Sequence, residues 1–183
     1  MSMIFLALLA ACWNDGGGDV FSKENAPWSM NAASVFLFKP ARENDGNQGT
    51  GVLAIGTSAL LACNTLDDSM PTSGSGLWFE IGYQTGRSPG SASPAWNGLY
   101  VSGEGVSTQT SAARTLRISG WHKGFSYSFT GTDAWLDVTD GAQNRFVGDF
   151  STQWWSGKFS ATRCEESGGD SNEQQSDTGD TGE

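Results

Sequence analysis

The stretch that decides the fold is FSYSFT at residues 125–130, in which aromatic and small polar residues alternate strictly. Successive side chains of a β-strand point to opposite faces of its sheet. This alternation therefore places three aromatic rings on one face and three hydroxyl groups on the other. The stretch predicts a strand with one aromatic face.

The chain on both sides of this stretch carries the same kind of signal. Runs of β-branched, aromatic or apolar residues, bounded by Gly, Pro, Asn or Ser, occupy 34–38, 52–55, 77–83, 99–102, 115–119 and 134–139. Asn97-Gly98 and Asp140-Gly141 are dipeptides that favour the positive φ values of tight turns. No long segment has a helical period, and only 58–68 leaves room for a helical turn, near Asn64. Short strands without crossover helices predict an all-β domain, an antiparallel β-sandwich or barrel.

A short pattern is repeated near the end of this region. Gly-x-Phe-Ser occurs at 148–151 and again at 157–160. We expect a hairpin whose two phenylalanines point inward from neighbouring strands, with Ser156-Gly157 near its turn. Asp149 and Lys158 then face each other on the outside, in a contact that stabilises by less than about 1 kcal/mol.

The amino-terminal residues 3–11 form an unbroken apolar run, which ends at Asn14-Asp15 and three glycines. The run is too short to cross a bilayer, which takes about 20 residues in a helix. A buried strand or helix is one interpretation, but the glycines leave little to hold such an element against a core. A short apolar core followed by small residues is typical of a secretory signal.

The residues Leu9-Ala10-Ala11-Cys12 narrow this interpretation, because they resemble the lipobox of bacterial lipoproteins. The resemblance implies that the chain is cut before Cys12 and that this cysteine carries the lipid, with the three preceding residues as the recognition box. Two or more acyl chains hold a protein firmly at a membrane without a spanning helix. In enterobacterial lipoproteins an Asp after the cysteine marks inner-membrane retention. Trp13 stands there instead, which favours an outer membrane if the cell has one.

The other end of the chain is similar to the close of many uncharacterised β-rich lipoproteins, where Gly-x-Phe-Ser-Ala, here at 157–161, is followed by a cysteine. This short resemblance implies no known activity.

The three cysteines fit the lipoprotein interpretation. An unpaired thiol is a liability in an exported protein, and lipidation of Cys12 leaves Cys63 and Cys164 as one pair. In an oxidising compartment these two form a disulfide, which closes a loop of about 100 residues and stabilises the fold by up to about 4.7 kcal/mol. Two buried free thiols are the alternative.

The chain therefore divides into a signal peptide, 1–11, a lipidated flexible tether, 12–26, a β domain, 27–164, and a disordered acidic tail, 165–183. The formal net charge is −10, and seven acids with no Lys or Arg follow Arg163, so the tail carries most of it. Nucleic acid is not an expected partner, because the domain offers no basic patch. The Asp-Thr-Gly repeat at 177–182 lacks the spacing of a calcium loop.

Residues that support catalysis are scarce. His122 is the single histidine and lies in an expected exposed turn, 121–124, so neither a metal site nor a catalytic triad is predicted, and no cofactor is expected. Glu80 and Glu104 are the acids that a glycosidase would use, if they lie close together.

The eight tryptophans are the most distinctive feature of the composition. Trp135 falls on the face opposite Leu136 and Val138, and Trp154 and Trp155 point to opposite faces if both lie in a strand. These three rings either stack on a sugar or fill the core. We expect an envelope lipoprotein with a structural or interaction role, whose partner is a glycan or another envelope protein. A carbohydrate-binding or adhesive module is the first alternative, and an enzyme with an unrecognised site is the second.

Overall fold

The computed structural model describes residues 17–30, 35–44, 48–57, 61–66, 69–84, 96–102, 113–129, 133–141 and 145–164. The strands are β1 (Gly17–Ser22), β2 (Val35–Asn44), β3 (Gln48–Gly56), β4 (Ser75–Gln84), β5 (Gly98–Val101), β6 (Ala113–His122), β7 (Phe125–Phe129), β8 (Trp135–Asp140), β9 (Arg145–Ser151) and β10 (Trp155–Arg163). A short 3₁₀-helix, η1, spans Cys63–Thr65, where a helical turn was expected. No helix within the described ranges has the length and apolar character needed to cross a membrane.

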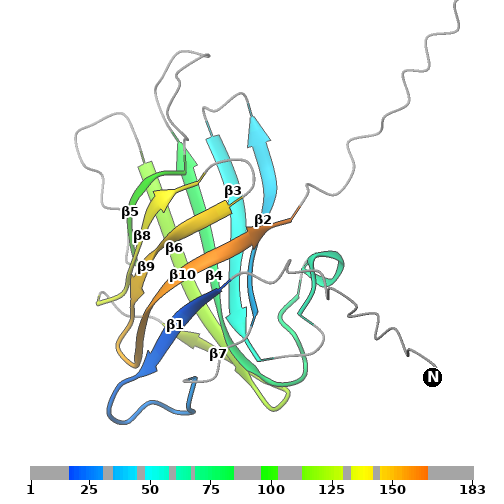
Figure 1. Cartoon of the computed structure of the whole chain (residues 1–183), viewed down its shortest axis with the longest axis vertical. Coiled ribbons are helices and arrows are strands. Elements are labelled where there is room, and N and C mark those ends of the chain that lie inside the picture. Colours follow the sequence, from blue (N-terminus) through cyan, green and yellow to red (C-terminus); the bar gives the residue numbers. More distant parts are fainter. Residues whose placement is uncertain are drawn as a thin grey trace, which may run out of the picture.

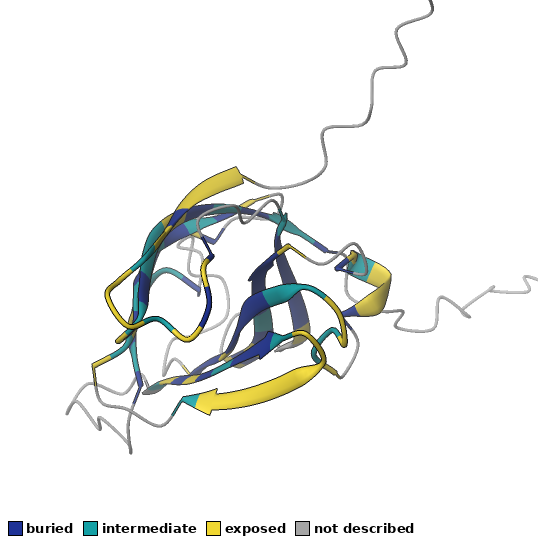
Figure 2. Ribbon diagram, turned by 90° about the horizontal axis from the view of Figure 1, so that it is seen from below, coloured by how far each residue is buried: buried dark blue, intermediate teal, exposed yellow. Residues whose placement is uncertain are grey.

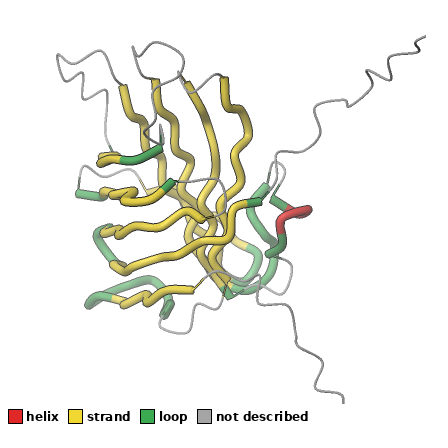
Figure 3. Tube along the Cα trace, turned by 45° about the horizontal axis from the view of Figure 1, so that its top comes forward, coloured by secondary structure: helices red, strands yellow, loops and turns green. Residues whose placement is uncertain are grey.

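The strands form one curled, mixed sheet in the order β5-β8-β9-β10-β2-β3-β4-β6-β7, and β1 pairs with β10 beside this path. The sheet bends into a half-barrel (Figure 1). We call β1, β5, β8, β9 and β10 the front half and β2, β3, β4, β6 and β7 the back half. Strands of the front half cross the direction of those in the back half (Figure 3). The prediction of an all-β domain is confirmed, and every strand except β1 falls on a segment expected to be extended.

The two halves meet through parallel contacts, which corrects the expectation of a purely antiparallel sheet. β10 runs parallel to β2, with Thr162 opposite Leu37. On the other side, Ser102 after β5 forms a parallel bridge with Leu116 of β6. The β10–β2 contact joins strands from opposite ends of the domain, whereas β5 and β6 are consecutive strands. Local alternation specifies that a segment is extended but not which distant strand it meets, or in which direction.

The contact between β5 and β6 is reinforced by the side chain of Arg114. Its guanidinium lies 4.9 Å from the centre of the Tyr100 ring, and its Nη1 donates to the Tyr100 Oη at 2.9 Å. Nη2 donates to the Asn97 carbonyl, and the Tyr100 hydroxyl donates to the Trp96 carbonyl at 2.8 Å. Burial raises the pKa of the Tyr100 phenol well above its usual range, and the positive charge of Arg114 opposes this shift. A neutral Tyr100 therefore takes part in the contact between β5 and β6.

The inner faces of both halves enclose the main core, which appears as buried strand surface when the molecule is viewed from below (Figure 2). Aromatic rings join the halves. Phe38 of β2 stacks on Phe146 of β9, with ring centres 3.7 Å apart, and Phe79 of β4 contacts the edge of Phe150 of β9 at 5.3 Å. These four rings are almost completely buried. Packing between the crossed halves therefore adds to the backbone pairing that joins them.

The repeated Gly-x-Phe pattern forms the β9–β10 hairpin. Phe150 lies opposite Gly157, and Phe159 lies opposite Gly148. A Cβ on Gly148 would meet the Phe159 ring at 2.8 Å, and a Cβ on Gly157 would meet the Phe150 ring at 3.0 Å. Each glycine therefore makes room for the phenylalanine of the other copy. Both rings are buried, as predicted.

Two details of this hairpin were also predicted, one correctly. Asp149 and Lys158 lie opposite each other, with 3.9 Å between Oδ1 and Nζ. The turn, however, lies at 152–154 and not near Ser156-Gly157, because Ser156 already pairs with Ser151. The Thr152 hydroxyl accepts from the Trp155 amide at 2.9 Å and fixes this turn.

A second apolar cluster covers the outer face of the back half. Trp78 of β4 and Trp121 of β6 point outward there, and the β3–β4 connection folds over them with Leu61 and Leu66. The Trp121 indole donates to the Ser73 carbonyl of this connection at 2.9 Å. Two large rings that a sheet alone would leave in water are therefore buried under a loop.

The disulfide predicted from the cysteine count is present and secures this loop. Cys63, at the start of η1, is joined to Cys164, which follows β10. The bond attaches the β3–β4 connection to the end of the last strand. It thereby holds the outer cluster against the back half.

The expected tether, 12–26, is partly a strand, so its carboxyl-terminal portion belongs to the domain. β1 pairs antiparallel with β10 from Gly17↔Ser160 to Ser22↔Trp155, and Val20 is buried in the core. A Cβ on Gly18 would lie 2.2 Å from the Lys158 carbonyl oxygen. This glycine allows a close approach to β10 rather than flexibility. The remaining residues, 12–16, and the expected tail, 165–183, lie outside the described residues.

The segment after β1 closes the lower end of the half-barrel. Trp28 is buried there against Trp155, with ring centres 4.7 Å apart, and stacks on His122 at 5.4 Å with nearly parallel planes. The His122 Nδ1 shares a hydrogen bond of 2.7 Å with the Ser75 hydroxyl. His122 is half-buried in β6, which corrects the expectation of an exposed turn histidine. Lys123 and Gly124, both with positive φ, form the tight turn that follows.

Of the two dipeptides expected to adopt positive φ, only one does so. Gly98 has a φ of 131°, at the start of β5. A Cβ there would lie 3.0 Å from the guanidinium of Arg114, so this glycine also leaves space for the contact between Arg114 and Tyr100. Gly141 does not have a positive φ and is buried beside Trp96.

Candidate functional site

The outer face of the front half carries a row of residues from five adjacent strands, which we call the serine row. Pairing of opposite residues places them in the order Val101, Trp135, Ser151, Ser156, Phe21. Opposite residues in a sheet point to the same face. Phe21 is 62% exposed and Trp135 is 37% exposed. The two rings are three strand spacings apart, about 14 Å, with two hydroxyl side chains between them.

A second row lies beside the serine row, two residues away from it on each strand, and we call it the acid row. It runs in the order Leu99, Asp137, Asp149, Lys158, Asp19. Lys158 stands between two aspartates, whereas Asp137 and Asp149 face each other directly. Like charges that face each other across strands destabilise a sheet. We call the serine row and the acid row together the platform.

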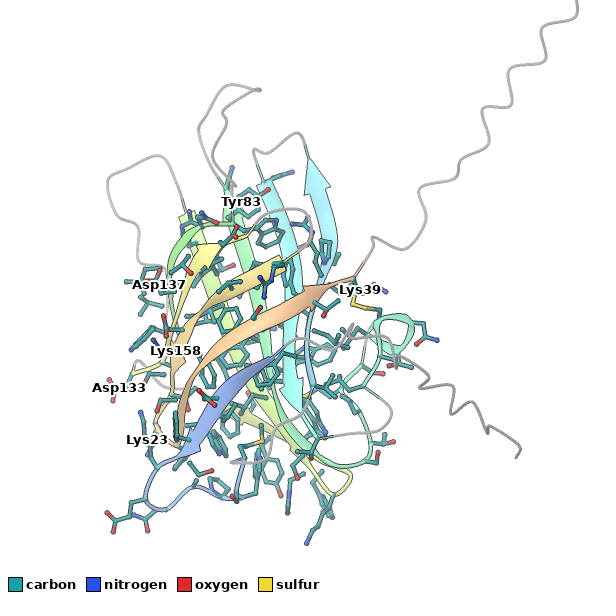
Figure 4. The ribbon with its side chains drawn as sticks, in the orientation of Figure 1. Lys23, Lys39, Tyr83, Asp133, Asp137 and Lys158 are labelled. Atoms are coloured by element: carbon teal, nitrogen blue, oxygen red, sulfur yellow. A yellow bond between two sulfur atoms is a disulfide. The ribbon has the colours of Figure 1, made fainter. Side chains whose placement is uncertain are left out.

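Lys23, which follows β1, adds a second cation at the margin of the platform. Its Nζ donates to the Ser151 hydroxyl at 2.8 Å and to the Thr152 carbonyl at 2.5 Å. Figure 4 shows Lys23, Lys158 and Asp137 along the same side of the domain. With three aspartates and two lysines, the platform is close to neutral. Its donors and acceptors are mixed over a short distance.

A pocket of about 170 Å³ lies next to the serine row, where the front half meets β6 and β7; we call it the seam pocket. Its lining residues are Ile118, Ser128, Phe129, Asp133, Ala134, Thr152, Gln153 and Trp154. The rings of Trp154 and Phe129 meet edge to face, with centres 5.1 Å apart. Asp133 and Gln153 are exposed. The pocket therefore combines an aromatic wall with a polar rim.

The three predicted tryptophans have different environments. Trp135 points outward from β8, on the face opposite Leu136 and Val138, as the alternation predicts. Trp154 lies in the β9–β10 turn and lines the seam pocket. Trp155 is fully buried, and its indole donates to the Trp28 carbonyl at 3.2 Å. This corrects the expectation for Trp155, which offers no ring face to a ligand.

Other residues singled out from the sequence contribute less to this surface. Glu80 is exposed on the back half, where it pairs with Arg117 at 3.5 Å, and Glu104 lies outside the described residues. Leu9, Ala10, Ala11 and Cys12 lie outside them as well. Within the described ranges, no group of three or more His, Cys, Asp or Glu residues is arranged to hold a metal ion.

Phe21 and Lys23 are functional candidates that the sequence analysis missed, because both lie in the expected tether. The signal was present but short. Asp19 to Ser22 alternates between outward and inward positions, with the buried Val20 next to the exposed Phe21. The preceding glycines, typical of a linker, concealed it.

Comparison with known proteins adds no assignment to this geometry. The sequence matches no protein-family model, no curated protein and no solved structure.

Proposed function

We propose that this chain is a lipid-anchored protein of the cell envelope whose β domain binds a neutral glycan on the platform. The anchor is Cys12, in the lipobox Leu9-Ala10-Ala11-Cys12, and the outer membrane is the favoured location if the cell has one. Because β1 begins at Gly17, the chain between Cys12 and the sheet spans at most about 18 Å even when extended. The domain is then held close to the bilayer.

The observation that carries the glycan proposal is the pattern of the serine row. Trp135 and Phe21 offer exposed rings at two separated positions, and Ser151 and Ser156 lie between them. Sugar chains alternate apolar ring faces, which stack on aromatic side chains, with hydroxyls, which need hydrogen-bond partners. A protein interface would instead favour an apolar centre, whereas the apolar residues of the platform lie at its two ends and the centre between them is polar. A linear glycan fits this spacing of rings and hydroxyls better.

The charges of the acid row narrow the ligand class. Asp19, Asp137 and Asp149 can accept hydrogen bonds from sugar hydroxyls, while Lys158 and Lys23 can donate. The near balance of charge disfavours polyanionic glycans, which are better matched by clustered cations. The proposed ligand is therefore an uncharged oligosaccharide or polysaccharide.

The glycan proposal is tested by screening the full chain on an array of neutral and acidic oligosaccharides. We expect binding to neutral chains, and Trp135→Ala or Phe21→Ala should weaken it at least about tenfold, or ~1.4 kcal/mol. Phe125→Ala is the matched control, because Phe125 is 69% exposed on β7, away from the platform. Absence of glycan binding, or equal loss in all three variants, would overturn the proposal.

The anchor is tested separately in cells. Cys12→Ser should leave an unprocessed precursor that takes up no labelled palmitate and leaves the membrane fraction. Cys63→Ser should still be labelled, because this cysteine belongs to the disulfide. Normal labelling of Cys12→Ser would contradict lipidation at that residue.

A further inference from the structure

The seam pocket is directly connected to the serine row, and this connection suggests a second level of recognition. Trp135 and Ser151 lie opposite each other in β8 and β9. Asp133 and Ala134 immediately precede Trp135, and Thr152 to Trp154 immediately follow Ser151. The pocket therefore begins where the Trp135–Ser151 pair ends. A chain bound along the serine row passes its entrance.

The walls of the pocket are suited to one side of a sugar ring. Trp154 and Phe129 supply an aromatic surface, and Ile118 of β6 extends it. The Thr152 hydroxyl is already engaged, because it donates to the Trp155 carbonyl at 3.1 Å. The Gln153 amide is exposed at the rim and is able to bond sugar hydroxyls in both directions. An apolar face and a polar edge are thus presented together.

The size of the pocket limits what it holds. At about 170 Å³ it is smaller than the roughly 300–1,000 Å³ typical of sites for drug-sized ligands. The strands β6 and β7 form its far wall through Ile118, Ser128 and Phe129. The space is about the size of a single ring, and β6 and β7 bound it on the side away from the serine row.

From this geometry we infer that the seam pocket binds one terminal sugar ring, at a chain end or on a one-residue branch, of the glycan that the platform holds. This inference rests on the proposed glycan binding and deepens it. The platform binds the internal sugar residues of the glycan, and the pocket binds its unsubstituted terminal sugar residue. Asp133 and Gln153 at the rim accept or donate hydrogen bonds to the free hydroxyls of that ring.

The inference is tested by NMR on the full chain labelled with ¹⁵N, in which the indole signals of Trp154 and Trp135 are assigned from Trp→Phe variants. The probes are glucose, galactose, mannose and N-acetylglucosamine at millimolar concentration, and a neutral polysaccharide selected on the array. We expect at least one monosaccharide to shift the Trp154 signal but not the Trp135 signal. The polysaccharide should shift both.

Two variants separate the pocket from the platform. Gln153→Ala should weaken monosaccharide binding at least fivefold, whereas Gln84→Ala, a matched exposed glutamine at the far end of β4, should not. If the polysaccharide shifts Trp135 and no monosaccharide shifts Trp154, the pocket inference fails and the platform stands. If a monosaccharide shifts Trp154 but no polysaccharide shifts Trp135, the platform fails instead. Monosaccharide binding that is unchanged in Gln153→Ala also overturns the pocket inference.

Discussion

Asp137 and Asp149 face each other across β8 and β9, on the outer face of the front half. Lys158 neutralises Asp149 only weakly, since 3.9 Å separates the charged atoms. Asp137 has no basic residue opposite it, because its other neighbour is Leu99. An opposed pair of like charges lowers stability, and sites that bind ligands often carry such costs.

Replacing Asp137 should separate stability from binding. Asp137→Asn removes the repulsion and is expected to raise the free energy of unfolding by about 0.2–1 kcal/mol at low salt. The gain should shrink at high salt, where the repulsion is screened. The same variant should bind the glycan less well, because it loses a carboxylate acceptor. Urea denaturation and glycan titration measure the two effects, with Glu80→Gln as the control; a less stable Asp137→Asn would contradict the repulsion.

The reciprocal glycines of the β9–β10 hairpin predict a large loss of stability on a minimal change. In Gly148→Ala the new methyl group would lie 2.0 Å from the Asp137 carbonyl oxygen, and in Gly157→Ala 2.0 Å from that of Asp19. Neighbouring strands would have to move, at a cost of about 1–3 kcal/mol or more. Gly17→Ala is the control, because a Cβ there has no neighbour within 4 Å. Equal urea midpoints for Gly148→Ala and Gly17→Ala would refute the close packing.

Loss of the disulfide should destabilise the domain and expose its outer cluster. A bond between residues 101 apart in sequence stabilises by up to about 4.7 kcal/mol in the chain-entropy account. We expect the double variant Cys63→Ser/Cys164→Ser to lose about 2–5 kcal/mol of unfolding free energy. Its tryptophan emission should move to longer wavelength as Trp78 and Trp121 meet water. Unchanged emission would show that the loop covers them without the bond.

The buried Tyr100 hydroxyl at the contact between β5 and β6 predicts a specific loss of stability at alkaline pH. Burial raises the pKa of Tyr100 in the folded state above the value near 10 of an unfolded chain. Between these two values the folded protein holds a proton that the unfolded chain releases. The stability that Tyr100 provides is therefore complete below about pH 10 and falls above it, by at most about 1.4 kcal/mol per pH unit.

The variant Tyr100→Phe isolates this effect. It should be less stable than the parent at neutral pH, because Arg114 loses a hydrogen-bond acceptor. Its stability should then decline less steeply between pH 10 and 11. Urea denaturation at both pH values provides the slopes. Identical slopes for parent and variant would show that Tyr100 ionises as easily in the fold as outside it.

Most of the strands were predictable because alternation is a local property. The alternation in the 134–139 segment places Trp135 and Leu136 on opposite faces, and in the structure Trp135 is exposed and Leu136 is buried. β1 was missed because its glycines suit a linker equally well. They are extended because β1 pairs with an edge of β10 that β9 leaves free. The parallel contact of β10 with β2 was not predictable either, since the partner strand lies far away in the sequence.

The candidate site was predictable only in part, for the same reason. The sequence placed Trp135 on the face opposite Leu136 and Val138 without deciding whether that face is exposed, and the serine row depends on the register of five strands. Trp154 and Trp155 were expected to diverge, yet alternation alone does not say which ring enters the core. The Thr152 hydroxyl decides this, because it holds 152–154 as a turn and starts the strand at Trp155.

β10 ends at Arg163, and it alone among the described strands pairs with β1, β2 and β9. During synthesis the first strand must wait for the last one, because β1 pairs with no other strand within the described ranges. The growing chain therefore has no complete sheet to form until nearly the whole domain has been made. Such a delay keeps the nascent polypeptide unfolded until its last strand is made, which is what the export proposed for this chain requires.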